Sequence, residues 1–116
     1  ISNWISKCMT TDIGYYFNMD QIKADPWGNP EKMWSHSPLK YANMAKTPTL
    51  FIQSDEDYRC YMGDALQMFS ALKYFGVEAR MCLFHGENHE LSRGGKPENR
   101  IDRMTEIIKW MDEYLK

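Results

Sequence analysis

Two short polar segments carry the side chains that could do chemistry. The first, SDEDYR, occupies residues 54–59, and the second, GENH, occupies residues 86–89. A carboxylate from the first segment could accept a hydrogen bond from the imidazole of His89. Such a bond fixes the imidazole tautomer and stabilises the imidazolium that forms when histidine takes a proton from a nucleophile. The two segments therefore predict an acid and a base that together serve a nucleophile.

Each polar segment follows an apolar run typical of a buried strand. We predict strands over residues 47–54 and 77–85, the first containing Leu50-Phe51-Ile52 after Pro48. The sequence between them has helical spacing and reaches a glycine stop at Gly76; the apolar stripe is Met62, Ala65, Leu66, Phe69 and Leu72. Strand, helix and strand form a βαβ unit, whose strands are parallel. Both polar segments should therefore emerge at the same sheet edge.

Helices are expected before and after this βαβ unit in the sequence. The aromatic-rich residues 1–35 predict short helices and loops, including a helix over Pro30–Ser35 capped by Asn29. Ser37 should cap a helical turn that begins at Pro38 and covers residues 39–43. A C-terminal helix is entered through residues 94–97, and its expected core stripe is Ile101, Met104, Ile107, Ile108, Met111 and Leu115.

The bulk composition excludes several classes of protein. The 116 residues are at most one domain, and a net charge of −2 without a basic stripe predicts no nucleic-acid partner. No apolar run is long enough for a membrane span, so we expect no membrane partner. Three cysteines without paired spacing indicate reduced thiols and a cytoplasmic protein. A zinc site from Cys82, His85 and His89 lacks a recurrent ligand spacing, so we expect no metal and no cofactor.

The chain looks like part of a larger domain. It begins at Ile1 without a methionine, and two strands do not make a stable sheet alone. If both faces of each strand are buried, further strands must complete the sheet. We therefore interpret residues 1–116 as the C-terminal part of an α/β domain.

The sequence resembles the C-terminal end of proteins in the prolyl oligopeptidase (S9) family, in its acylaminoacyl-peptidase-like branch. The resemblance covers essentially the whole chain; it is carried by ISNWISKCMTTDIGYYF, DPWGNPEKMWSHSPLKY, SPLKYANMAKTPTLFIQSDEDYRC and ALQMFSALKYFGVEARMCLFHGENHELSRGGKPENRIDRMTEIIKWMDEYL. It implies an α/β-hydrolase fold, preceded in family members by a β-propeller, with a Ser-Asp-His triad. This chain would hold the C-terminal portion of that fold, without its N-terminal half.

The resemblance assigns roles to three residues. The family's glycine-x-x-Asp-x-Arg pattern implies that Asp57 is the triad acid, with Arg59 near the acyl or carbonyl end of the substrate. The glycine-x-x-His pattern implies that His89 is the triad base. Three positions depart from the family pattern: Ser54 replaces a glycine, Tyr61 a proline, and Glu90 a residue that is often glycine. The Gly-x-Ser-x-Gly elbow does not occur in this sequence, so the isolated chain should lack peptidase activity.

Other residues compete for these roles. Asp55 and Glu56 are alternative acids, although the motif favours Asp57, and Arg59 could be a surface ion-pair residue. We expect His36 and His85 to be non-catalytic. Nothing in the sequence indicates a depressed pKa for Cys60, so a thiol nucleophile is not expected.

The predicted function is that of a serine-peptidase fragment, which supplies the acid and base for hydrolysis of oligopeptides or acylated peptides. The alternatives are a non-catalytic α/β interaction module and part of a small carboxylesterase of the same fold. Besides a peptide substrate, we expect a second copy of the chain as a partner. The outer edge of the strand at residues 49–54 would expose backbone groups that pair with another strand, most simply in a two-fold dimer.

Overall fold

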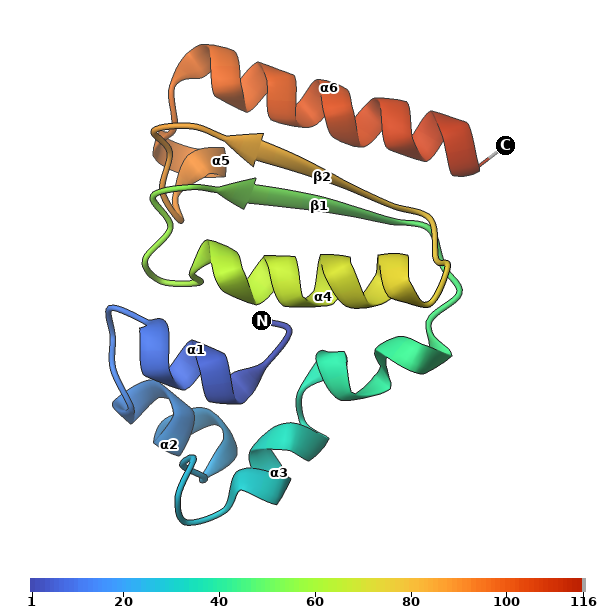
Figure 1. The fold of residues 1–116 in the computed structure, drawn as a ribbon. Helices are drawn as coiled ribbons and strands as arrows, with labels where there is room; N and C mark the ends of the chain where they lie inside the picture. Colours follow the sequence, from blue (N-terminus) through green and yellow to red (C-terminus); the bar gives the residue numbers. More distant parts are fainter. Residues whose placement is uncertain (116) are drawn as a thin grey trace.

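A short parallel sheet lies between two long helices in the computed structural model, which describes residues 1–115 (Figure 1). Strands β1 (Thr49–Ser54) and β2 (Ala79–Phe84) pair in parallel, with Thr49 opposite Ala79 and Ser54 opposite Phe84. Helix α4 (Met62–Tyr74) covers one face, and α6 (Pro97–Tyr114) covers the other. The predicted βαβ unit is confirmed, and both strands end at the same sheet edge.

The remaining elements are short. Helices α1 (Trp4–Thr10), α2 (Tyr16–Ile22) and α3 (Pro30–Ser35), with the 3₁₀ helix η1 (Pro38–Met44), lie beyond α4 on the side away from the sheet. A single turn, α5 (Leu91–Gly94), precedes α6. No helix within residues 1–115 is both long and apolar enough to cross a bilayer.

The strands are shorter than predicted. β1 begins two residues after Thr47 because Pro48 has no N–H to donate to a ladder. β2 begins at Ala79 because Val77 still belongs to the turn, where its N–H donates to Leu72 O over 2.9 Å. Gly76, at φ +75°, ends the helical segment as predicted, since a left-handed conformation there favours glycine.

Two hydrophobic clusters hold the chain together. One lies among the N-terminal helices and contains Cys8, Ile22, Ala24 and Met33, with Trp4 and Ile5 packed against it. The other joins α4 to the sheet through Leu72, Val77 and Ala79, where the Phe51 and Phe69 rings meet edge to face at 5.9 Å. The second cluster holds α4 against one face of the sheet. It therefore also fixes the positions at which the polar loops leave the strands.

The predicted stripe on α4 is wrong at one position. Leu66 is exposed, whereas Asp64 on the same helix is buried. The Asp64 carboxylate accepts hydrogen bonds from the backbone N–H groups of Ser2 and Asn3, at 2.8 and 3.1 Å. The first turn of α4 therefore binds the N-terminal segment through a polar contact, while its later turns pack on the sheet.

The predicted stripe on α6 is largely exposed, contrary to expectation. Ile101, Ile108 and Leu115 are 66%, 54% and 74% exposed, and Trp110 is the residue of this helix that is buried. The sheet of residues 1–115 has two strands, which is too narrow to cover the whole apolar face of an 18-residue helix. For the same reason, residues 50–52 are half-buried rather than covered on both faces.

The two capping predictions had different outcomes. Asn29 caps α3 as predicted, because its side-chain oxygen accepts from the Lys32 N–H at 3.0 Å. Ser37 precedes η1 but makes no capping hydrogen bond. Its hydroxyl accepts from the Trp4 N–H and donates to Met33 O, at 2.9 and 2.8 Å, and so joins α1 to α3.

Candidate active site

The acid loop between β1 and α4 holds Asp57 in a fixed orientation. One carboxylate oxygen of Asp57 accepts from the backbone N–H groups of Arg59 and Cys60, at 3.0 and 2.8 Å. Aspartate commonly turns a chain in this way by bonding its own backbone two or three residues on. The residue is buried at 7% exposure. The local sequence therefore leaves the second carboxylate oxygen to face the neighbouring loop.

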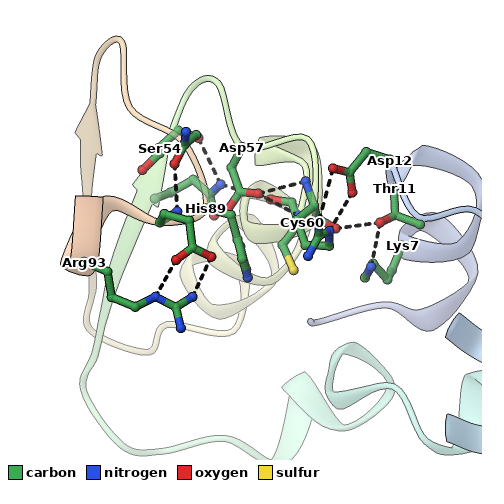
Figure 2. Close-up of polar contacts among 12 residues, drawn as sticks. Lys7, Thr11, Asp12, Ser54, Asp57, Cys60, His89 and Arg93 are labelled. Atoms are coloured by element: carbon green, nitrogen blue, oxygen red, sulfur yellow. Dashed lines mark hydrogen bonds and ion pairs between the residues drawn. The ribbon is translucent and has the colours of Figure 1, made fainter. Parts of the chain in front are cut away.

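His89 occupies that neighbouring loop, directly opposite Asp57 (Figure 2). Its Nδ1 lies 3.0 Å from the second carboxylate oxygen of Asp57. An Nδ1–H that donates to the carboxylate leaves Nε2 as the nitrogen able to take a proton. The structure thus brings together the two residues that the family resemblance implies are the acid and the base, which are 32 positions apart in the sequence.

Glu87 holds the His89 loop in place through hydrogen bonds to neighbouring segments. It is 5% exposed, and one of its carboxylate oxygens accepts from the Lys96 N–H at 2.9 Å and from Asn99 Nδ2 at 2.6 Å. The hydrogen bond from Asn99 is the largest cause that lowers the pKa of Glu87. Its backbone carbonyl accepts the Glu56 N–H at 3.0 Å. Glu87 thereby ties the His89 loop both to α6 and to the acid loop.

A second acid–histidine pair lies at the same sheet edge. Asp55 places one carboxylate oxygen 2.8 Å from His85 Nδ1, and the other accepts the Gly86 N–H at 2.8 Å. This pair is more open, since the side chain of His85 is 80% exposed and that of Asp55 is 30% exposed. Gly86, at φ +68°, makes the turn that separates the two histidines. Asp55, which competes with Asp57 for the role of acid, therefore contacts the other histidine.

Arg59 leaves the acid loop towards the N-terminal helices. Its Nε lies 2.6 Å from a carboxylate oxygen of Asp12, an ion pair that lowers the pKa of Asp12. Thr11 and Asp12 also bond the loop backbone, through Thr11 Oγ1 to Arg59 O and Asp12 N to Tyr58 O, both at 2.9 Å. Thr11 and Asp12 could not be identified from the sequence, because neither belongs to a local motif with the loop.

The remaining candidates lie elsewhere or are bonded to other groups. Burial raises the pKa of the Cys60 thiol, which disfavours a thiolate nucleophile there. Cys82 Sγ lies 3.7 Å from a Glu106 carboxylate oxygen, not in a cluster with His85 and His89. Within residues 1–115, no three His, Cys, Asp or Glu side chains gather as metal ligands. Glu90 is bonded to Arg93.

His89 lines three hollows of the described chain. The first, of about 350 Å³, also includes Ser54, Asp57 and Asn88, and the second, of about 240 Å³, includes Arg59 and Glu90. The third, of about 290 Å³, lies towards the N-terminal helices and is lined by Ile1, Lys7, Ile13, Phe17, Arg59, Cys60 and His89. An imidazole that is hydrogen-bonded to a buried carboxylate and lines a pocket can act as a general base on a bound substrate.

Comparison with known proteins places the chain in a family of peptidases. The model of the prolyl oligopeptidase family matches residues 1–116. The uncharacterized peptidase YuxL of Bacillus subtilis is 44% identical over 115 residues, which are 99% of this chain and 18% of that protein. Dipeptidyl-peptidase 5 of Schizosaccharomyces pombe is 31% identical over 87% of this chain and 14% of that protein.

The fold has a close match among solved structures. The acylaminoacyl peptidase of Pyrococcus horikoshii superposes with a TM-score of 0.91 and 34% identity, over 97% of this chain and 18% of that one. This match confirms the predicted α/β-hydrolase class. The chain spans less than a fifth of each of these proteins.

Proposed function

The chain belongs to the prolyl oligopeptidase family of peptidases, and from this we propose that Asp57 and His89 are the acid and base of its Ser-Asp-His triad. The observation that carries the proposal is the 3.0 Å contact between His89 Nδ1 and an Asp57 carboxylate already oriented by two backbone N–H groups. A buried, oriented carboxylate is what a catalytic imidazole needs in order to keep one tautomer through the reaction.

In the proposed mechanism, His89 Nε2 takes the proton of a serine hydroxyl as the serine oxygen attacks a peptide carbonyl. The imidazolium that forms is stabilised by Asp57 and then gives its proton to the leaving amine. The serine would lie outside residues 1–116, since the sequence contains no Gly-x-Ser-x-Gly elbow. The substrates would be oligopeptides or N-acylated peptides, as the names of the dipeptidyl-peptidase and acylaminoacyl-peptidase relatives suggest.

The test is peptide hydrolysis by the intact protein that contains this chain. His89→Ala should lower kcat by about 10⁴-fold or more while the protein stays folded, and Asp57→Asn should lower it by about 10⁴-fold because the imidazole loses its tautomer. His36→Ala is the matched control, because His36 is an exposed residue at the end of α3 and should leave kcat unchanged. Turnover that survives His89→Ala would refute the proposal, and hydrolysis of esters but not amides would favour the carboxylesterase alternative.

We also propose that the protein works in the cytoplasm. All three cysteines of the described chain are free thiols, and burial is the largest cause that raises the pKa of each one. Cell fractionation tests this location, and recovery of the protein in a secreted or periplasmic fraction would overturn it.

A further inference from the structure

Lys7 is a buried cation close to the candidate active site. The residue is 2% exposed, and its Nζ donates to Thr11 Oγ1 over 2.7 Å (Figure 2). Nζ also lies 4.8 Å from the centre of the Phe17 ring. An ammonium group has three N–H donors, and this hydrogen bond uses one of them. Within residues 1–115, no carboxylate lies within ion-pair distance of Nζ.

A buried cation without an anionic partner is costly to keep. Burial is the main cause that lowers the pKa of Lys7; the neighbouring Cys60 thiol opposes this shift, and the Arg59 guanidinium adds to it. The two carboxylates whose charge acts on Lys7, Asp12 and Asp64, already accept other hydrogen bonds. Lys7 therefore has donor capacity that the described chain does not use.

The unused N–H donors of Lys7 lie next to the proposed base, His89. Lys7 and His89 line the same pocket of about 290 Å³, and Ile13 and Phe17 give the pocket apolar walls. The pocket's other cationic side chain, Arg59, is bonded to Asp12. A group that fits this pocket would have a short apolar stem and an anionic end.

We infer that this pocket binds an acidic side chain of the substrate, aspartate or glutamate, beside the bond that is cleaved. The methylene groups would lie against Ile13 and Phe17, and the carboxylate would accept hydrogen bonds from Lys7. The inference rests on the proposed function, because this pocket adjoins the cleaved bond only if His89, which lines it, is the catalytic base. An apolar or amide side chain would leave the buried ammonium unpaired, so Lys7 would discriminate against it.

The first test compares two substrates of nearly equal shape in the intact protein. The wild type should hydrolyse N-acetyl-Glu p-nitroanilide about tenfold faster in kcat/KM than N-acetyl-Gln p-nitroanilide, because charge-assisted hydrogen bonds discriminate by that amount or more. Lys7→Met keeps the apolar stem and removes the charge, so the Glu-to-Gln ratio should fall to about one. Lys7→Arg should keep a preference for Glu.

The matched control is Lys46→Met, which removes the same charge at an exposed site just before β1, at the opposite end of the strands from the polar loops. It should keep the wild-type ratio. A wild-type ratio of one or below would overturn the inference whether or not Lys7→Met folds. A high ratio that persists in folded Lys7→Met would overturn it as well.

A second measurement does not depend on catalysis. Calorimetric titration with N-acetylglutamate should show binding to the wild type, and binding about tenfold weaker to Lys7→Met, with N-acetylglutamine as the neutral comparison. If the protein hydrolyses neither anilide but binds N-acetylglutamate through Lys7, the proposed function fails and the pocket assignment stands. No preference of the wild type for N-acetylglutamate over N-acetylglutamine would overturn the pocket assignment.

Discussion

His85 lies four positions before His89 in the same loop, yet it contacts a different carboxylate, with its Nδ1 2.8 Å from Asp55. The two acid–histidine pairs join the same two loops side by side. Asp55 also accepts the Gly86 N–H, so it holds the start of the turn that leads to His89. We interpret the Asp55 pair as a positioning contact and the more buried Asp57 pair as the catalytic one.

The Asp55 pair should give a small, acid-sensitive contribution to stability. The hydrogen bond from His85 lowers the pKa of Asp55, so the folded state binds the Asp55 proton more weakly than the unfolded state does. The contribution is therefore complete above the ordinary carboxyl range, near pH 4, and is lost as pH falls through the lowered folded-state value. Thermal unfolding should show Asp55→Asn less stable than the wild type at pH 6, with the gap closing below about pH 4.

The control for this measurement is Asp102→Asn, on an exposed position of α6. Asp102→Asn should be as stable as the wild type at both pH 6 and pH 3. A gap for Asp55→Asn that is unchanged between pH 6 and pH 3 would show that the carboxylate charge is not what stabilises the contact.

Two leucines on α4 should differ sharply in their contribution to stability. Leu72 is 1% exposed in the cluster with Val77 and Ala79, whereas Leu66 is 37% exposed. Leu72→Ala should lower the free energy of unfolding by about 2–5 kcal/mol, since it removes transfer energy and leaves a cavity. Leu66→Ala should cost less than about 1 kcal/mol. Urea denaturation measures both, and equal losses would contradict the observed orientation of α4.

How far the sequence predicts this molecule depends on the range of the contacts involved. The meeting of Asp57 and His89 was predictable because parallel strands bring their following loops to one edge, whatever the loops contain. The environment of Arg59 was not, because Asp12 reaches it from a helix with no sequence signal for that packing. Lys7 was missed for the same reason: a lysine in a short helix is usually exposed, and its burial depends on where α2 and the acid loop lie.

The apolar stripe of α6 shows a different limit. Its period predicted correctly that the segment is a helix, and the positions of Ile101 and Ile108 identify its apolar face. Periodicity states which side chains favour burial, but not whether the chain contains enough sheet to bury them. The exposed face and the half-buried Leu50 and Ile52 of β1 therefore follow from the size of the sheet.

We expect the 116-residue chain to associate through the same surfaces. Within residues 1–115, the outer edge of β1 has no strand beside it, and exposed apolar side chains lie on α6 and directly after it: Ile101, Met104, Ile108, Met111 and Leu115. Such edges and apolar patches recruit partners, so light scattering at micromolar concentration should give the mass of a dimer or larger species. Ile108→Glu should weaken association, whereas Thr105→Glu, one turn away and polar already, should weaken it less. A monomeric wild-type chain would contradict this prediction.

The most direct test of the central claim is the rate at which a fluorophosphonate probe modifies the serine of the intact protein. That reaction requires an activated serine and reports it without a substrate. Asp57→Asn should slow labelling by about 10³-fold or more, whereas Asp55→Asn should slow it by about tenfold or less. The 116-residue chain alone should remain unlabelled. Rapid labelling of Asp57→Asn, with loss of labelling in Asp55→Asn, would show that the pair at His85 and not the pair at His89 activates the nucleophile.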